Sequence, residues 1–194
     1  NYWMHNGFVN IDNVKMSKSL GNFITVHDAL KTIDGQVLRF FFATQHYRKP
    51  INFTEKAVHD AEVNLKYLKN TYEQPFTGKV DLTELQAFLD KFTAAMDEDF
   101  NAANGITVVF EMAKWINSGH YSQEVKTAFA ELLQVFGIVF TAEVLDADIE
   151  ALIEKRQIAR AAKDFATADK IRDELAAKGI KLLDTKDGVR WIRD

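Results

Sequence analysis

The chain has 194 residues, which is enough for one domain with a sizeable core or for two small domains. Apolar residues make up 47% of it and charged residues 27%, as in ordinary globular proteins, and two prolines argue against a disordered chain. The absence of cysteine excludes disulfides and thiolate metal sites and is consistent with a reducing, cytoplasmic compartment. No run of 18 apolar residues occurs, so we expect no membrane span and no membrane partner.

The net charge of -4 is distributed unevenly along the chain. Residues 1–50 carry six Lys or Arg against three Asp or Glu, and residues 149–194 carry eleven against nine. Between them, residues 51–148 carry seven against sixteen. Because lysine and arginine neutralise phosphates, we expect a phosphate-bearing partner to contact the two ends of the chain and to avoid the middle.

The first predicted elements are a short strand and a turn. Trp3 to Val9 has the pattern of a strand, Asp12-Asn13 that of a turn, and the chain is expected to return through Val14. Helical spacing begins near His27 and continues across Gly35. Three successive phenylalanines, Phe40–Phe42, indicate a helix that is buried on more than one face.

Amphipathic helices are predicted through the middle of the chain. Thr54 is suited to cap a helix that the segment Pro75–Lys79 ends. Further runs with helical spacing follow at 82–96, 102–117 and 123–136.

A weaker break at 141–148 precedes the last segment. Residues 149–163 and 165–178 predict two helices, with Gly179 as the stop, and residues 180–183 and 189–192 resemble two short strands. The predicted fold class is therefore mainly α. It comprises a helical bundle, a short N-terminal strand and loop segment, and a small C-terminal unit made of a helix hairpin and two strands.

The run Lys15–Asn22 carries the strongest functional signal. Lys15 and Lys18 place two flexible ammonium groups three residues apart, which suits phosphate oxygens. The run closes with Gly-Asn, which accepts backbone angles that most residues cannot, so the loop can change shape cheaply. Ser17 and Ser19 either donate hydrogen bonds to phosphate or only shape the loop.

Lys15 to Ser19 is identical to the KMSKS signature of class I aminoacyl-tRNA synthetases, whose loop closes over ATP as the amino acid is adenylated. From Asn1 to Asp194 the chain resembles cysteinyl-tRNA synthetase. The stretches that carry this resemblance are Asn1–Val9, Phe23–Leu30, Val37–Phe42, His46–Arg48, Met96–Asn101 and Ala162–Phe165. The resemblance covers the family's C-terminal part only. Its nucleotide-binding domain, with the HIGH signature and zinc ligands, is expected before Asn1.

The resemblance implies three parts. Residues 1–26 would end the catalytic and stem-contact region, residues 27–140 would form a DALR-like helical bundle that binds the anticodon arm, and residues 148–194 would recognise the anticodon. It gives Lys18 a direct contact with ATP, with Lys15 beside it. It also implies ATP with magnesium as cofactor, cysteine and tRNA(Cys) as partners, and zinc in the preceding part but no metal in this chain. We expect a monomer.

The C-terminal segment holds a combination of side chains that suits RNA. Arg160, Phe165, Asp169 and Asp184 offer a cation, an aromatic face and two acceptors, and single-stranded bases are read by stacking and hydrogen bonding. The resemblance places anticodon readers in this stretch, where Phe165 replaces the family's frequent Trp, and makes Lys163 at most a phosphate contact. In the structural alternative, Arg160 and Asp169 form a local ion pair and Phe165 plugs the hairpin.

Other polar clusters carry weaker signals of function. His46-Tyr47-Arg48 either contacts RNA or ends a helix, where cations suit the dipole. Asp97-Glu98-Asp99 precedes a predicted helix, and we expect it to cap that helix without any catalytic role. The five histidines show no spacing typical of metal ligands.

These observations predict the C-terminal part of an enzyme that activates cysteine with ATP and transfers it to tRNA(Cys). The chain would supply the lysine loop and the RNA-binding helices and would be inactive alone. Three alternatives stay open: a ligase that uses cysteinyl-adenylate to acylate an amino sugar, a non-catalytic RNA-binding module, and a synthetase for another amino acid.

Overall fold

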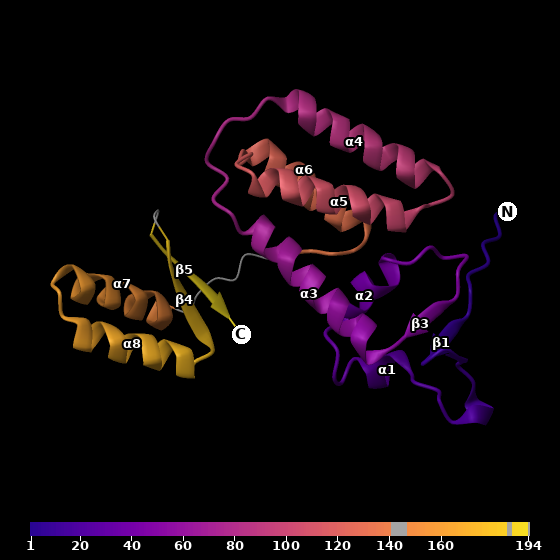
Figure 1. The fold of residues 1–194 in the computed structure, drawn as a ribbon, viewed down its shortest axis with the longest axis horizontal. Helices are drawn as coiled ribbons and strands as arrows, with labels where there is room; N and C mark the ends of the chain where they lie inside the picture. Colours follow the sequence, from indigo (N-terminus) through magenta and orange to yellow (C-terminus); the bar gives the residue numbers. More distant parts are fainter. Residues whose placement is uncertain (141–146, 186–187, 194) are drawn as a thin grey trace. The chain divides into compact units, whose positions relative to one another are not determined.

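Buried apolar side chains gather in two separate clusters, one drawn from residues 37–138 and a smaller one from residues 149–180. The two clusters belong to two units, residues 1–141 and 142–194, and each unit is described by itself. Figure 1 shows the fold as a computed structural model. It describes the backbone of residues 1–140, 147–185 and 188–193, and the side chains of residues 1–140 and 148–182.

A small three-stranded sheet begins the larger unit. Its order is β2 (Val14–Lys15), β1 (Val9–Ile11), β3 (Ile51–Phe53), with β1 antiparallel to β2 and parallel to β3. The turn between β1 and β2 has positive φ at both Asp12 and Asn13, as two-residue hairpin turns require. The expected turn is therefore present, but the expected strand at 3–9 is wrong, because pairing with β3 starts only at Val9.

Three helices follow, and side chains cap each of them. Thr25 precedes α1 (Val26–Ala29), Asp34 precedes α2 (Gly35–Ala43) and Thr54 precedes α3 (Glu55–Tyr72); each side chain accepts a backbone N–H from the first turn of its helix. In α2, Phe40 and Phe41 are buried together with Val37 and Leu38, while Phe42 is exposed, so the helix buries one broad face.

The larger unit is completed by α4 (Leu82–Asp97), α5 (Ala102–Asn117) and α6 (Gln123–Val135), which pack against one another (Figure 1). The core centres on fully buried side chains of α3, α5 and α6: Leu68, Met112, Ile116 and Phe129. Asn101 caps α5, so the expectation that Asp97–Asp99 caps this helix is wrong. Asp97 instead ends α4, and Asp99 binds side chains far away in the sequence.

The smaller unit is a helix hairpin followed by a strand hairpin. Helix α7 (Ala147–Ala161) packs against α8 (Phe165–Ala177), and strand β4 (Ile180–Thr185) pairs antiparallel with β5 (Gly188–Arg193). Ile149, Ile171, Leu175 and Ile180 form its buried cluster. Gly179, at φ 74°, ends α8 as predicted. The predicted fold class, mainly helical with these small strand pairs, is confirmed.

Candidate functional site

The lysine loop, residues Lys15–Asn22, is closed by hydrogen bonds within itself. Asn22 Oδ1 accepts the backbone N–H of Ser17 at 2.9 Å, and Asn22 Nδ2 donates to the carbonyl of Lys15 at 3.4 Å. Ser17 Oγ caps a 3₁₀ turn, η1 (Lys18–Leu20), by accepting the N–H of Leu20 at 3.3 Å, and Gly21 follows at φ 69°. Because these contacts are local, the loop holds its shape without support from the helical core.

Both serines take part in this local framework. The hydroxyl oxygens of Ser17 and Ser19 lie 3.2 Å apart, so one donates to the other. The loop-shaping alternative for these two serines is thus supported by contacts within the loop. A phosphate contact from either hydroxyl stays a prediction.

Each lysine of the loop lies over an aromatic ring that the sequence pattern did not single out. Lys15 Nζ is 3.7 Å from the centroid of the Phe8 ring, and Lys18 Nζ is 5.6 Å from that of Phe23. Neither ammonium forms an ion pair with a carboxylate in the described part of the chain. Both charges are therefore exposed and are not neutralised by an acid.

Backbone hydrogen bonds fix the start of the loop to strand β1, and they fix the segment before β1 to the segment before β3. The N–H of Met16 donates to Val9 O at 3.0 Å, and the N–H of Gly7 donates to Tyr47 O at 2.7 Å. A Cβ at Gly7 would lie 2.3 Å from Lys49 O, so only glycine fits this close approach of two backbone segments.

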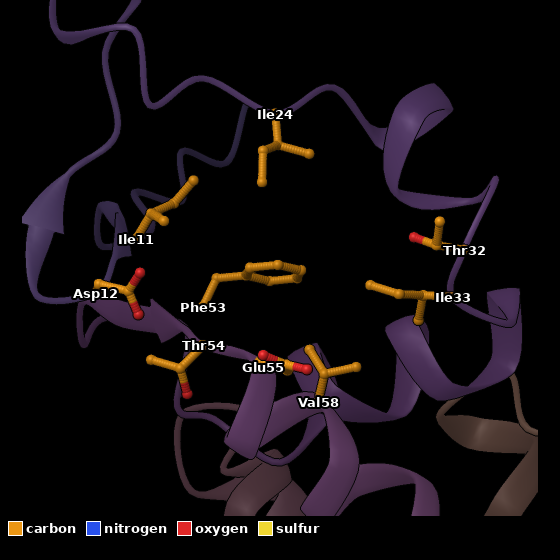
Figure 2. A pocket seen from close by; sticks show the side chains of 9 residues that line it. All are labelled: Ile11, Asp12, Ile24, Thr32, Ile33, Phe53, Thr54, Glu55 and Val58. Carbon is orange, nitrogen blue, oxygen red and sulfur yellow. The ribbon is translucent and has the colours of Figure 1, made fainter.

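An open pocket of about 400 Å³ lies beside the exit of the loop. Figure 2 shows Ile24 facing the hollow opposite Phe53, with Ile11 and Ile33 at its sides. The carboxylates of Asp12 and Glu55 belong to its lining, and neither loop lysine does. Two acids would repel phosphates, so this pocket does not suit a nucleotide.

Of the predicted RNA-contact residues, Lys163 lies in the turn between α7 and α8. Lys163 has φ 60°, in the left-handed region that glycine usually fills at a helix end, and the N–H of Asp164 reaches back to Ala159 O at 2.9 Å. Asp164 then caps α8 by accepting the N–H and the hydroxyl of Thr167. These hydrogen bonds hold the pKa of the Asp164 carboxyl below its usual value, so it stays charged at the turn.

Phe165 and Asp169 lie four residues apart in the first turns of α8 and so share one face of that helix. Phe165 is 62% exposed, so it does not plug the hairpin as the structural alternative would require. Asp169 Oδ1 lies 3.5 Å from Arg172 Nη1 one turn later. Arg160 is exposed in the last turn of α7. The backbone of Asp184 pairs with Val189, and its side chain lies outside the described residues.

Among residues whose side chains are described, no group of three or more His, Asp or Glu is arranged to hold a metal ion. Within those residues no helix combines the length and the apolar character needed to cross a membrane. His46 stacks on Tyr47 at 5.1 Å between ring centroids, and His120 stacks on Trp115 at 4.4 Å.

Three family models match successive parts of the chain. Residues 1–63 match the catalytic domain of class I tRNA synthetases (C), residues 91–141 the DALR domain, and residues 142–191 the anticodon-binding domain of cysteinyl-tRNA ligase. The lysine loop lies in the first match, and the α7–α8 turn lies in the third.

Curated relatives match over the full chain. Cysteine–tRNA ligase of Streptococcus pneumoniae serotype 4 is 83% identical over 194 residues. The chain belongs to the cysteine–tRNA ligase family. Family members from Streptococcus mutans and Streptococcus thermophilus are 80% and 77% identical over the same 194 residues. The match covers 100% of this chain and 43% of each of these ligases, so the chain spans under half of their length.

Proposed function

We propose that this chain is the part of a cysteine–tRNA ligase that closes a lysine loop over ATP and binds tRNA(Cys). The complete enzyme would join cysteine to ATP as cysteinyl-adenylate and then transfer cysteine to the end of the tRNA. The carrying observation is the exposed pair of lysines on a self-closed loop, in a chain whose C-terminal unit matches an anticodon-binding domain.

The lysine loop would supply positive charge to the adenylation step. Adenylation builds negative charge on the α-phosphate and on the departing pyrophosphate, and preorganised cations lower such a barrier. Lys18, on the short turn η1, is the residue we assign to this role, with Lys15 beside it. Magnesium would accompany ATP, and zinc belongs to the part of the enzyme outside this chain.

The smaller unit supplies recognition of the anticodon. Phe165 presents an exposed ring on which a base can stack, and Asp169 offers an acceptor on the same helix face. Arg160 and Lys163 lie before this face, at the end of α7 and in the turn, where phosphate oxygens would be neutralised. Asp184, in β4, would be a second acceptor for a base edge. We also propose that the enzyme acts in the cytoplasm as a monomer.

The alternatives lack a supporting observation. An amino-sugar ligase has no use for an anticodon-binding unit, yet residues 142–191 match one. A non-catalytic RNA-binding module has no use for the lysine loop, yet residues 1–63 match a catalytic domain.

The proposal is tested on the full-length protein that carries this chain. It should catalyse ATP–pyrophosphate exchange that depends on cysteine, and it should charge tRNA(Cys) with cysteine. A matched reaction with serine, which differs from cysteine by oxygen for sulfur, should give little exchange. Binding of tRNA without any amino-acid-dependent exchange would favour the RNA-binding module and contradict the proposal.

A further inference from the structure

Three side chains join the segment before β3 to the turn between α4 and α5. Arg48 Nε donates to Asp99 Oδ2 at 2.6 Å and its Nη2 donates to Oδ1 at 3.0 Å, so the ion pair is bidentate. Tyr47 Oη donates to the same Oδ1 at 2.7 Å. We name Tyr47, Arg48 and Asp99 the Asp99 clamp. Its hydrogen bonds fix direction as well as distance, since a guanidinium and a carboxylate are both planar.

The backbone at the clamp is held in an uncommon conformation. Asp99 and Phe100 have φ 55° and 52°, so two successive residues other than glycine lie in the left-handed region. Burial does not explain this, because the Phe100 side chain is 61% exposed. Helix ends account for part of it, since Asn101 caps α5 and the N–H of Phe100 closes the end of α4 on Met96 O at 3.1 Å. Left-handed residues other than glycine persist where the surroundings over-determine them, and the clamp adds its constraint to that of the helix end.

On its other side the clamp reaches the lysine loop through short contacts. Tyr47 O accepts the N–H of Gly7, and Phe8 O accepts the N–H of Ile51. The ring of Phe8 lies under the ammonium group of Lys15. These hydrogen bonds, with the close approach of Gly7 to Lys49 O, hold this strip of backbone against the segment that carries Tyr47 and Arg48.

The two ends of this path lie in different functional regions. Residues 1–63, with the loop, match a catalytic domain, and residues 91–141, with Asp99, match the DALR domain. We propose that the Asp99 clamp sets the lysine loop and its catalytic region relative to helices α4 and α5, so that tRNA held by the helices presents its end to the activated cysteine. This proposal rests on the proposed function. Tyr47, Arg48 and Asp99 are positioning residues in it.

Stability is not the role we assign to the clamp. The side chains of Arg48 and Asp99 are 64% and 43% exposed, and ion pairs this exposed contribute little to folding. A matched pair occurs nearby, where Lys91 of α4 binds Glu111 of α5 with side chains 56% and 44% exposed. That pair joins two helices of the bundle and does not reach the catalytic region, so it serves as the control.

The test uses full-length enzyme carrying Asp99→Asn, Arg48→Met, both changes, or the control Glu111→Gln. Single-turnover transfer of cysteine to tRNA should fall by roughly 3- to 30-fold in the clamp variants, the range typical of coupling between sites. The rate of cysteine-dependent ATP–pyrophosphate exchange should stay within about twofold of the parent rate. The melting temperatures of the clamp variants should match that of the Glu111→Gln control. The double variant should lose no more than the worse single variant.

Two results would overturn the inference. One is transfer by Asp99→Asn within about twofold of the parent rate, because the clamp would then position nothing. The other is an equal loss of exchange and transfer, because the cluster would then serve adenylation or folding. Failure of the proposed function is separate from both, since the parent enzyme itself would show no cysteine-dependent exchange.

Discussion

Asn22 Oδ1 accepts the backbone N–H of Ser17 at 2.9 Å and so ties the end of the lysine loop to its middle. Between these two residues lie Lys18 and the left-handed Gly21. The side chain of Asn22 thus does for the loop what a cap does for a helix: it satisfies a backbone donor that the turn would otherwise leave to water. The position of the Lys18 ammonium group depends on this closure.

Removing Lys18 should affect adenylation far more than tRNA binding. In the full-length enzyme, Lys18→Ala should slow cysteine-dependent ATP–pyrophosphate exchange by roughly 10²- to 10³-fold, the usual loss for one charge stabiliser. Lys31→Ala is the matched control, because Lys31 is an exposed lysine outside the loop that pairs with Asp28. An exchange rate within twofold of the parent for Lys18→Ala would contradict the role assigned to Lys18.

Opening the loop should cost activity even with both lysines present. Asn22→Ala removes the acceptor for Ser17 N–H and the donor to Lys15 O. Misplacing a catalytic group by about 1 Å costs up to about 100-fold, so exchange should fall by roughly 10- to 100-fold. Asn52→Ala, which removes a side-chain bond to Asn13 outside the loop, should leave the rate nearly unchanged. Equal rates for the two variants would show that loop closure by Asn22 is not needed.

The exposed ring of Phe165 should contribute to binding and hardly at all to folding. Phe165→Ala should weaken binding of tRNA(Cys) by about 1–3 kcal/mol, the range for one base stacked on an aromatic side chain. Ile158→Ala in α7 is the control, because this apolar side chain is 63% exposed and carries no assigned contact. Filter binding with melting curves separates the two effects. A lower melting temperature with unchanged affinity would instead make Phe165 structural.

Asp169 and Lys163 should differ in what they recognise. Asp169→Ala removes the proposed base acceptor, so discrimination between cognate tRNA and an anticodon-mutated tRNA should fall by about 1–3 kcal/mol. Lys163→Ala removes the proposed phosphate contact, so both tRNAs should bind more weakly and the salt dependence should flatten. Arg172 pairs with Asp169 and also with Asp173, so Arg172→Ala removes both ion pairs while leaving the Asp169 carboxylate in place. If Arg172→Ala and Asp169→Ala behave alike, Asp169 acts through its ion pair.

The Asp99 clamp should be resistant to acid. Hydrogen bonds from Arg48 and Tyr47 lower the pKa of Asp99 below its usual value. Any stabilisation of the folded state by this carboxylate is therefore complete above the pKa that Asp99 has in the unfolded chain. It is lost only as the pH falls through the lower pKa of the folded state. Carboxyl ¹³C NMR of the chain should show Asp99 titrating below ordinary aspartates. Arg48→Met should raise the midpoint toward the usual value. Lys31→Met should instead raise that of Asp28, whose pKa Lys31 lowers.

Local signals in the sequence predicted the helices well. Thr54 followed by apolar residues at helical spacing marked the start of α3, and the structure confirms the cap with a bond from Ala57 N–H to Thr54 Oγ1 at 3.1 Å. Gly179 marked the end of α8, because glycine readily adopts the positive φ of 74° found there. Caps and stops are properties of a few neighbouring residues, so a single sequence contains them.

Contacts between distant residues were not predictable in this way. The strand expected at 3–9 is displaced to Val9–Ile11, because its parallel partner β3 lies about 40 residues later. Asp99 was expected to cap the next helix, but it binds Arg48, 51 positions earlier. The same holds for Phe8, whose place under Lys15 depends on how the sheet pairs. The roles of the site residues stay predictions, which the variants above would test.

Lys163 places a limit on how stable the smaller unit can become. At a φ of 60°, a residue with a Cβ destabilises the folded state by about 1 kcal/mol relative to glycine. Replacing Lys163 with glycine would relieve this strain and would also remove the positive charge. If the charge meets RNA, the chain has exchanged part of its stability for affinity at this single position. Homologous enzymes adapted to heat would then face a choice here, between a firmer turn with glycine and a tighter hold on the nucleic acid with lysine.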